Sequence, residues 1–137
     1  MILSISDIEK ARKNLQKTGF IYLLLAVICA FAGAIYEIFS HGVFSYYMLY
    51  AFGFPLAGGA LPFLAAGCFG RRDFGRTALR AYHAGIGTLT TGSFVQGILE
   101  IYGTTNKLVF VYWVLGGVLL TGGIFMGYLT KGRNICN

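Results

Sequence analysis

Two glutamates, Glu37 and Glu100, occupy matching places near the ends of two long apolar segments. A carboxylate at membrane depth is energetically costly, so each acid is a candidate functional residue. His41 follows Glu37 by four residues, a spacing that places both on one face of a helix. If the two acids and this histidine converge, they form a site that shares a proton or holds a small cation. Alternatively, each acid is hydrogen-bonded separately to tyrosines and to backbone N–H groups near the lipid headgroups.

A second group of polar side chains, the polar stripe, runs along the predicted helix 78–102. Its members advance by 7, 3, 3 and 4 residues, and they are His83, Thr90, Ser93, Gln96 and Glu100. At about 100° per residue, these positions lie along one side of a helix. Lipid cannot satisfy such groups, so the stripe must face other helices or water. Two interpretations stay open, namely a polar seam that joins helices and a hydrated path for a proton, an ion or a polar solute.

The two halves of the chain indicate an internal repeat. When the sequence is shifted by 63 residues, seven residues of the first half fall on identical residues of the second, both acids among them. Lys13 and Lys17 fall on Arg76 and Arg80 in the same register. Transporters with parallel repeats relate their halves by rotation about the membrane normal. We therefore expect two helical hairpins of this kind, with both acids at the same depth.

The composition places the chain in the membrane. Charged residues make up 12% of the chain, against about 25% in a soluble domain. Four segments reach the roughly 20 residues that a helix needs to span a bilayer. They lie near residues 19–40, 44–69, 78–102 and 108–130. The sequence therefore predicts an all-α integral membrane protein, a four-transmembrane-helix bundle in which residues 1–137 form a single membrane domain.

The basic residues indicate the orientation of that domain in the cell membrane. They cluster before the first segment, between the second and third, and after the fourth, which is the positive-inside pattern with both termini cytoplasmic. This distribution explains the net charge of +6 without nucleic acid. The candidate contacts to anionic lipid headgroups are Lys13, Lys17, Arg71, Arg72 and Arg76. Within residues 1–17, Ser6 and Glu9 form a capping box that predicts a short amphipathic helix on the inner surface.

Two prolines interrupt the second apolar segment. Pro55 and Pro62 each remove a backbone N–H and crowd the carbonyl four residues earlier. The freed carbonyls of Ala51 and Gly58 must therefore find other partners or line a cavity. We expect a kinked helix in this part of the chain.

The chain contains no spacing that is typical of a metal site or of a catalytic nucleophile. It has no H-E-x-x-H and no nucleophile elbow, and its three cysteines form no C-x-x-C. We expect no metal, no cofactor and no disulfide framework. The interpretation is a non-enzymatic membrane protein, with a small membrane-embedded enzyme as the weakest alternative.

Two stretches of the chain resemble a known group of proteins. FSHGVFSYYM with FPLAGGALPF, and YHAGIGTLTTGS with ILEIYGTT, are similar to small four-span membrane proteins of Gram-positive bacteria that carry no assigned activity. The resemblance covers most of the chain. It implies a bacterial cytoplasmic membrane and supplies no mechanism.

Two functional hypotheses follow from these patterns. In the first, the protein binds or transports a small cation or polar solute through Glu37, Glu100 and the polar stripe. In the second, it is an accessory or regulatory subunit of a larger membrane complex, and the stripe joins helices. A transporter of this size needs oligomerisation to enclose a path, so we expect a homo-oligomer or a larger complex. Gly123 and Gly127 form the G-x-x-x-G spacing that allows close helix association.

Overall fold

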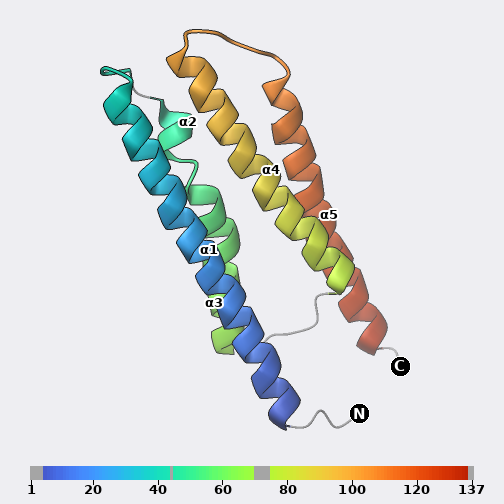
Figure 1. Ribbon diagram of the computed structural model, residues 1–137. Helices are drawn as coiled ribbons and strands as arrows, with labels where there is room; N and C mark the ends of the chain where they lie inside the picture. Colours follow the sequence, from blue (N-terminus) through green and yellow to red (C-terminus); the bar gives the residue numbers. More distant parts are fainter. Residues whose placement is uncertain (1–4, 44, 70–74, 136–137) are drawn as a thin grey trace.

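The computed structural model describes residues 5–43, 45–69 and 75–135 and is all-helical over these ranges (Figure 1). Three long helices are α1 (Ile5–Phe39), α4 (Arg76–Ile101) and α5 (Val109–Ile135). The second apolar segment is divided into α2 (Tyr46–Leu49), the π-helix η1 (Phe54–Ala60) and α3 (Leu61–Phe69). In Figure 1, α1 begins and α5 ends at the lower end, and α1 and α4 end at the upper end.

Three of the four expected spans have the length and composition needed to cross a membrane. They are Ile5–Phe39, Tyr46–Cys68 and Val109–Thr130. The predicted amphipathic helix is continuous with the first of them inside α1. The helix α4 has 26 residues, which is a sufficient length, but it carries the polar stripe and falls short on hydropathy. Its insertion and the orientation of the termini stay predictions.

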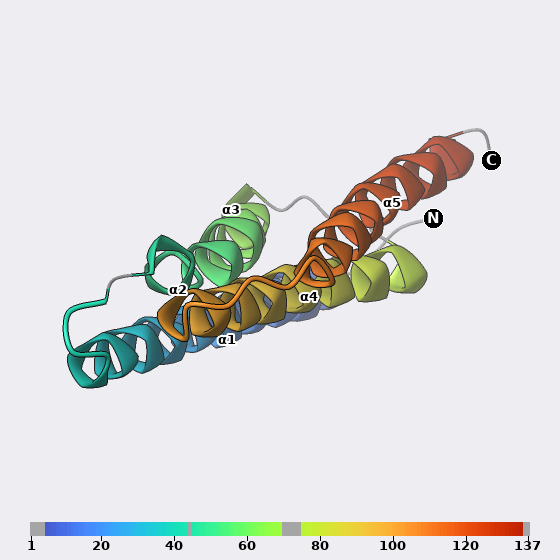
Figure 2. The same ribbon diagram turned by 90° about the horizontal axis from the view of Figure 1, so that it is seen from above.

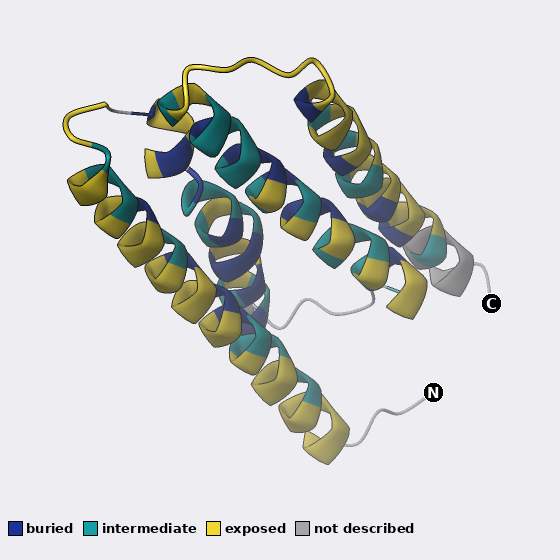
Figure 3. Ribbon diagram, turned by 45° about the horizontal axis from the view of Figure 1, so that its top comes forward, coloured by how far each residue is buried: buried dark blue, intermediate teal, exposed yellow. Residues whose placement is uncertain are grey.

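The helices form a sequence of neighbours rather than a closed bundle. Within the described ranges α1 packs on η1 and α3, and η1 packs on α4. Helix α5 packs along α4, and its Trp113 also forms edge-to-face ring contacts with Tyr47 of α2 and Phe54 of η1. Helices α1 and α4 do not bring any pair of described Cα atoms within 8 Å of each other. Figure 2 shows this arrangement of the helices from above. In Figure 3 the buried positions face the neighbouring helices and the exposed positions cover the outer faces. The space between α1 and α4 is therefore filled by side chains and cavities.

Glycines set the closest helix contacts. A Cβ at Gly59 of η1 would lie 2.3 Å from the ring of Tyr22 in α1. A Cβ at Gly123 of α5 would lie 2.8 Å from the backbone nitrogen of Tyr82 in α4. Gly123, one half of the G-x-x-x-G spacing, is therefore used for packing inside the chain, where small residues let helices approach.

The break in the second apolar segment follows from its prolines and glycines. Pro55 lies in the first turn of the π-helix, in which hydrogen bonds run to the fifth residue. The carbonyl of Gly58, which loses its donor to Pro62, accepts a hydrogen bond of 2.6 Å from the hydroxyl of Tyr82. This contact confirms the expectation that the freed carbonyl finds a partner. In the expected repeat, η1 corresponds to residues 117–123, which form part of the continuous helix α5. The two hairpins therefore differ at this point, and their superposition stays a prediction.

Candidate functional site

Glu100, at the upper end of α4, accepts a hydrogen bond from the residue that precedes α2. The hydroxyl of Ser45 donates to its Oε2 at 2.7 Å. Ser45 is 1% exposed and stands at the N-cap of α2. A bond to an ionised acceptor is stronger than one between neutral groups. Glu100 therefore fixes the start of α2 against α4.

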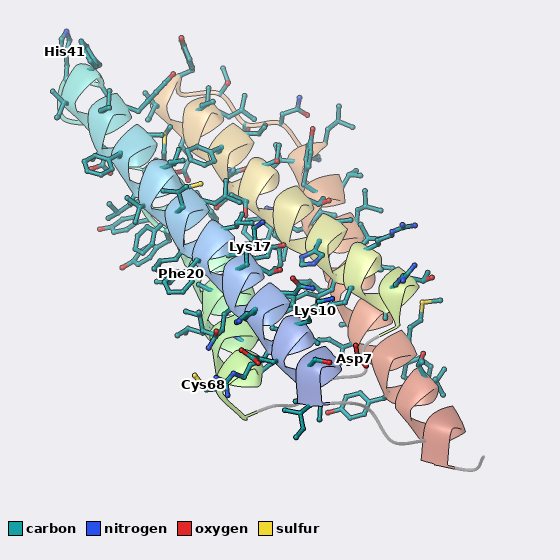
Figure 4. The ribbon with its side chains drawn as sticks, turned by 60° about the horizontal axis from the view of Figure 1, so that its bottom comes forward. Asp7, Lys10, Lys17, Phe20, His41 and Cys68 are labelled. Atoms are coloured by element: carbon teal, nitrogen blue, oxygen red, sulfur yellow. The ribbon has the colours of Figure 1, made fainter. Side chains whose placement is uncertain are left out.

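Glu37, near the upper end of α1, has a different environment. Its Oε1 is buried and has no hydrogen-bond partner among the described residues. His41 does not share its helix face, because α1 ends at Phe39 and His41 has a φ of 55°. The expected i, i+4 pair is wrong for this reason, and Figure 4 shows His41 beyond the end of α1. In the described ranges, no group of three or more His, Cys, Asp and Glu side chains is placed to hold a metal ion.

The upper half of the polar stripe joins helices. Ser93 is 1% exposed, and its hydroxyl donates to the carbonyl of Tyr47 at 2.9 Å. Met48 of α2 lies in the space left by Gly33 on α1 and Gly97 on α4. Gln96 is half-buried beside this contact region along α4. This part of the stripe is a seam that holds α2 against α4, which was one of the two interpretations of the sequence.

The lower half of the stripe reaches across to α1. Nδ1 of His83 and the hydroxyl of Tyr22 are joined by a hydrogen bond of 2.5 Å. The imidazole also stacks on Tyr22 and on Phe63 of α3, with ring centroids 5.5 and 5.1 Å apart. Three helices therefore meet at one aromatic cluster. Tyr22 and Phe63 were not among the expected site residues. The available signal for Tyr22 was its hydroxyl inside an apolar segment, where such a group needs a partner.

Two cavities meet at this cluster. The lower cavity has a volume of about 670 Å³ and is lined by residues of α1, α3, α4 and α5. The upper cavity has a volume of about 470 Å³ and is lined by α1, η1 and α4. Thr18 and His83 line both cavities. Thr90, whose hydroxyl donates to the carbonyl of Ile86 in its own helix, lines the upper one. Both volumes lie in the range of small-molecule sites, roughly 300–1,000 Å³.

The charge of these cavities is positive. Arg76, the first residue of α4, lines the lower cavity, and no described Asp or Glu lines either cavity. Neither of the acids singled out in the sequence belongs to the cavities. The remaining polar lining consists of neutral groups, including Asn14, Thr18 and Tyr82 in the lower cavity.

Two other basic candidates, Lys13 and Lys17, line neither cavity. Lys13 forms an exposed ion pair with Glu9 at 2.8 Å. Lys17 is exposed. Arg71 and Arg72 lie outside the described residues. Arg76 is therefore the one expected headgroup contact that the described ranges place at a cavity.

Comparison of the chain with models of protein families, with curated proteins and with solved structures found no match. Function is therefore inferred from the cavities and from the residues that line them.

Proposed function

We propose that this protein is a membrane protein that binds a small, mainly apolar molecule in the two cavities between α1 and α4. The observation that carries this proposal is the meeting of both cavities at Thr18 and His83. Ligand sites are typically apolar pockets with a few polar groups that orient the ligand. The polar groups at this meeting point are the hydroxyl of Thr18 and the imidazole of His83, which is hydrogen-bonded to Tyr22.

The lining favours an apolar molecule over the cation expected from the sequence. A cation needs carboxylates or oriented dipoles to replace its hydration. The described lining supplies no carboxylate and adds the positive charge of Arg76. The contacts of Ser93 and Glu100 with the chain around α2 lie beyond the upper cavity along α4. These contacts favour binding over passage through the protein.

The proposal is tested by filling the upper cavity from Gly87. This residue lines the cavity, and a Cβ there would have no neighbour within 4 Å. Gly87→Leu therefore adds a large side chain at the wall of the cavity without a backbone clash. The matched control is Gly122→Leu, because Gly122 is exposed on α5, is equally free of neighbours and lines neither cavity.

Cys29, which lines the upper cavity, is the reporter. Cys68→Ala and Cys136→Ala leave it as the single thiol. In dodecyl maltoside, hexadecanol is expected to slow the alkylation of Cys29 by N-ethylmaleimide, followed by mass spectrometry. The Gly87→Leu variant should lose this protection and the Gly122→Leu variant should keep it. If neither hexadecanol nor palmitate slows alkylation in the parent, or if Gly87→Leu behaves as the parent does, the proposal fails.

An accessory role in a larger membrane complex is a second candidate, favoured by one observation. Within the described ranges α5 contacts α4 and, through Trp113, the rings of Tyr47 and Phe54, while its outward residues Val118 and Phe125 are exposed. Cysteines introduced at these two positions are expected to cross-link to a partner in native membranes if this face is an interface. If neither position forms a cross-link, the outward face of α5 contacts lipid and is not an interface with a partner protein.

A further inference from the structure

We propose that the ligand is an anionic amphiphile with one hydrocarbon chain, bound with its head at Arg76 and its chain crossing from the lower cavity into the upper. This inference rests on the proposed function and names the chemical class of its ligand. Free fatty acids and single-chain phosphates share this chemistry. The test below separates the two head groups.

The head group follows from the charge of the lower cavity. Arg76 is its single charged lining residue among those described, and it stands where α4 begins. A guanidinium group offers a planar pair of donors that fits a carboxylate or a phosphate. Asn14 of α1 lines the same cavity and adds a neutral amide. A cationic head would meet a like charge with no acid in the described lining to offset it.

The walls and the length of the two cavities indicate that the ligand has a hydrocarbon chain. Apolar residues Leu15 and Leu79 line the lower cavity, and Leu25 and Ile86 line the upper one. From Arg76 to Ile86, which lines the upper cavity, is about 15 Å along α4 at 1.5 Å per residue. One leaflet of a bilayer has about 15 Å of hydrocarbon, half of the roughly 30 Å core. A chain of leaflet length that starts at Arg76 therefore reaches the upper cavity.

The aromatic cluster lies on this course. His83 is seven residues from Arg76, or about 10 Å along the helix, and its bond to Tyr22 crosses the space between α1 and α4. A chain of leaflet length passes this level, so it contacts the rings of the cluster. The smaller volume of the upper cavity favours one chain over two.

The test compares four probes that differ in the head alone. They are palmitate, hexadecyl phosphate, hexadecanol and hexadecyltrimethylammonium, each at the same mole fraction in dodecyl maltoside with the single-thiol protein. Protection of Cys29 is expected at about tenfold lower concentration for the anions than for hexadecanol, as for one charge-assisted bond. The cation is expected to protect least. The order of palmitate and hexadecyl phosphate identifies the preferred head.

Arg76→Gln removes the proposed partner of the head, and Arg80→Gln is the matched control one turn later, exposed and outside both cavities. Arg76→Gln should abolish the preference for anions and leave protection by hexadecanol unchanged, whereas Arg80→Gln should alter neither. Arg76→Lys keeps the charge and should retain part of the preference for anionic probes. It also replaces Arg76→Gln in the test if that variant does not fold. If hexadecanol protects as well as the anions, or if Arg76→Gln and Arg76→Lys both keep the full preference, this inference is overturned while cavity binding stands.

Discussion

The hydroxyl of Tyr22 in α1 lies 2.5 Å from Nδ1 of His83 in α4, although 61 residues separate them in the chain. The two helices have no described Cα pair within 8 Å, so this bond crosses a gap that the backbone leaves open. Phe63 of α3 stacks on both rings. The pair therefore joins the helices and stands between the two cavities.

Tyr22→Phe is expected to destabilise the protein by about 1–3 kcal/mol, because the ring stays and Nδ1 of His83 loses its partner inside an apolar region. The thermal unfolding midpoint in detergent measures this loss. Tyr128→Phe is the control, since Tyr128 is exposed on α5. The double variant Tyr22→Phe with His83→Phe should recover most of the stability, because removal of both polar groups leaves none unpaired. A double variant less stable than Tyr22→Phe alone would contradict this account.

Tyr82→Phe is expected to lower stability by about 1–2 kcal/mol, because its hydroxyl supplies the donor that Pro62 denies to the carbonyl of Gly58. Pro62→Ala restores a backbone N–H four residues after Gly58. In that background the same Tyr82→Phe change should cost less, and a thermodynamic cycle over the four proteins measures the difference. Equal costs in both backgrounds would show that the hydroxyl does not act through this carbonyl.

Glu37→Gln and Glu100→Gln are expected to change stability in opposite directions. Glu37 has a buried oxygen without a described partner, so removal of its charge should raise the unfolding midpoint. Glu100 accepts from Ser45, and a neutral acceptor should weaken that bond by about 1 kcal/mol. When Ser45→Ala is also present, Glu100→Gln should no longer lower the unfolding midpoint. A loss of stability in Glu37→Gln would indicate that a ligand or ion compensates its charge.

Cysteines at Asn106 and Thr77 are expected to report opposite sides of the membrane. Both positions are exposed, with Asn106 between α4 and α5 and Thr77 at the start of α4. In intact cells a membrane-impermeant thiol reagent should label position 106 and spare position 77. Ser45, another position between spans, is unsuitable because it is 1% exposed. Labelling of position 77 from outside would refute the orientation derived from the basic residues.

The sequence alone determined the features that depend on local chemistry. Runs of apolar residues predict long helices, because in lipid each backbone group must bond within its own segment. The need of the Gly58 carbonyl for a new partner follows from Pro62 in the same way. The first span was predicted to end near residue 40, close to the end of α1 at Phe39, whereas the pairing of Glu37 with His41 assumed a further turn of helix. Gly42, with its φ of 90°, is the type of residue that ends a helix.

Tertiary structure decided which polar groups meet, because those meetings depend on how helices dock. The stripe on α4 was predicted as one surface, yet its upper half bonds to the chain around α2 and its lower half bonds to α1. No local pattern links Tyr22 to His83, or Ser45 to Glu100. The cavities exist because η1 and α3 hold α1 away from α4, and that separation depends on the fit of glycines such as Gly59 against a distant ring.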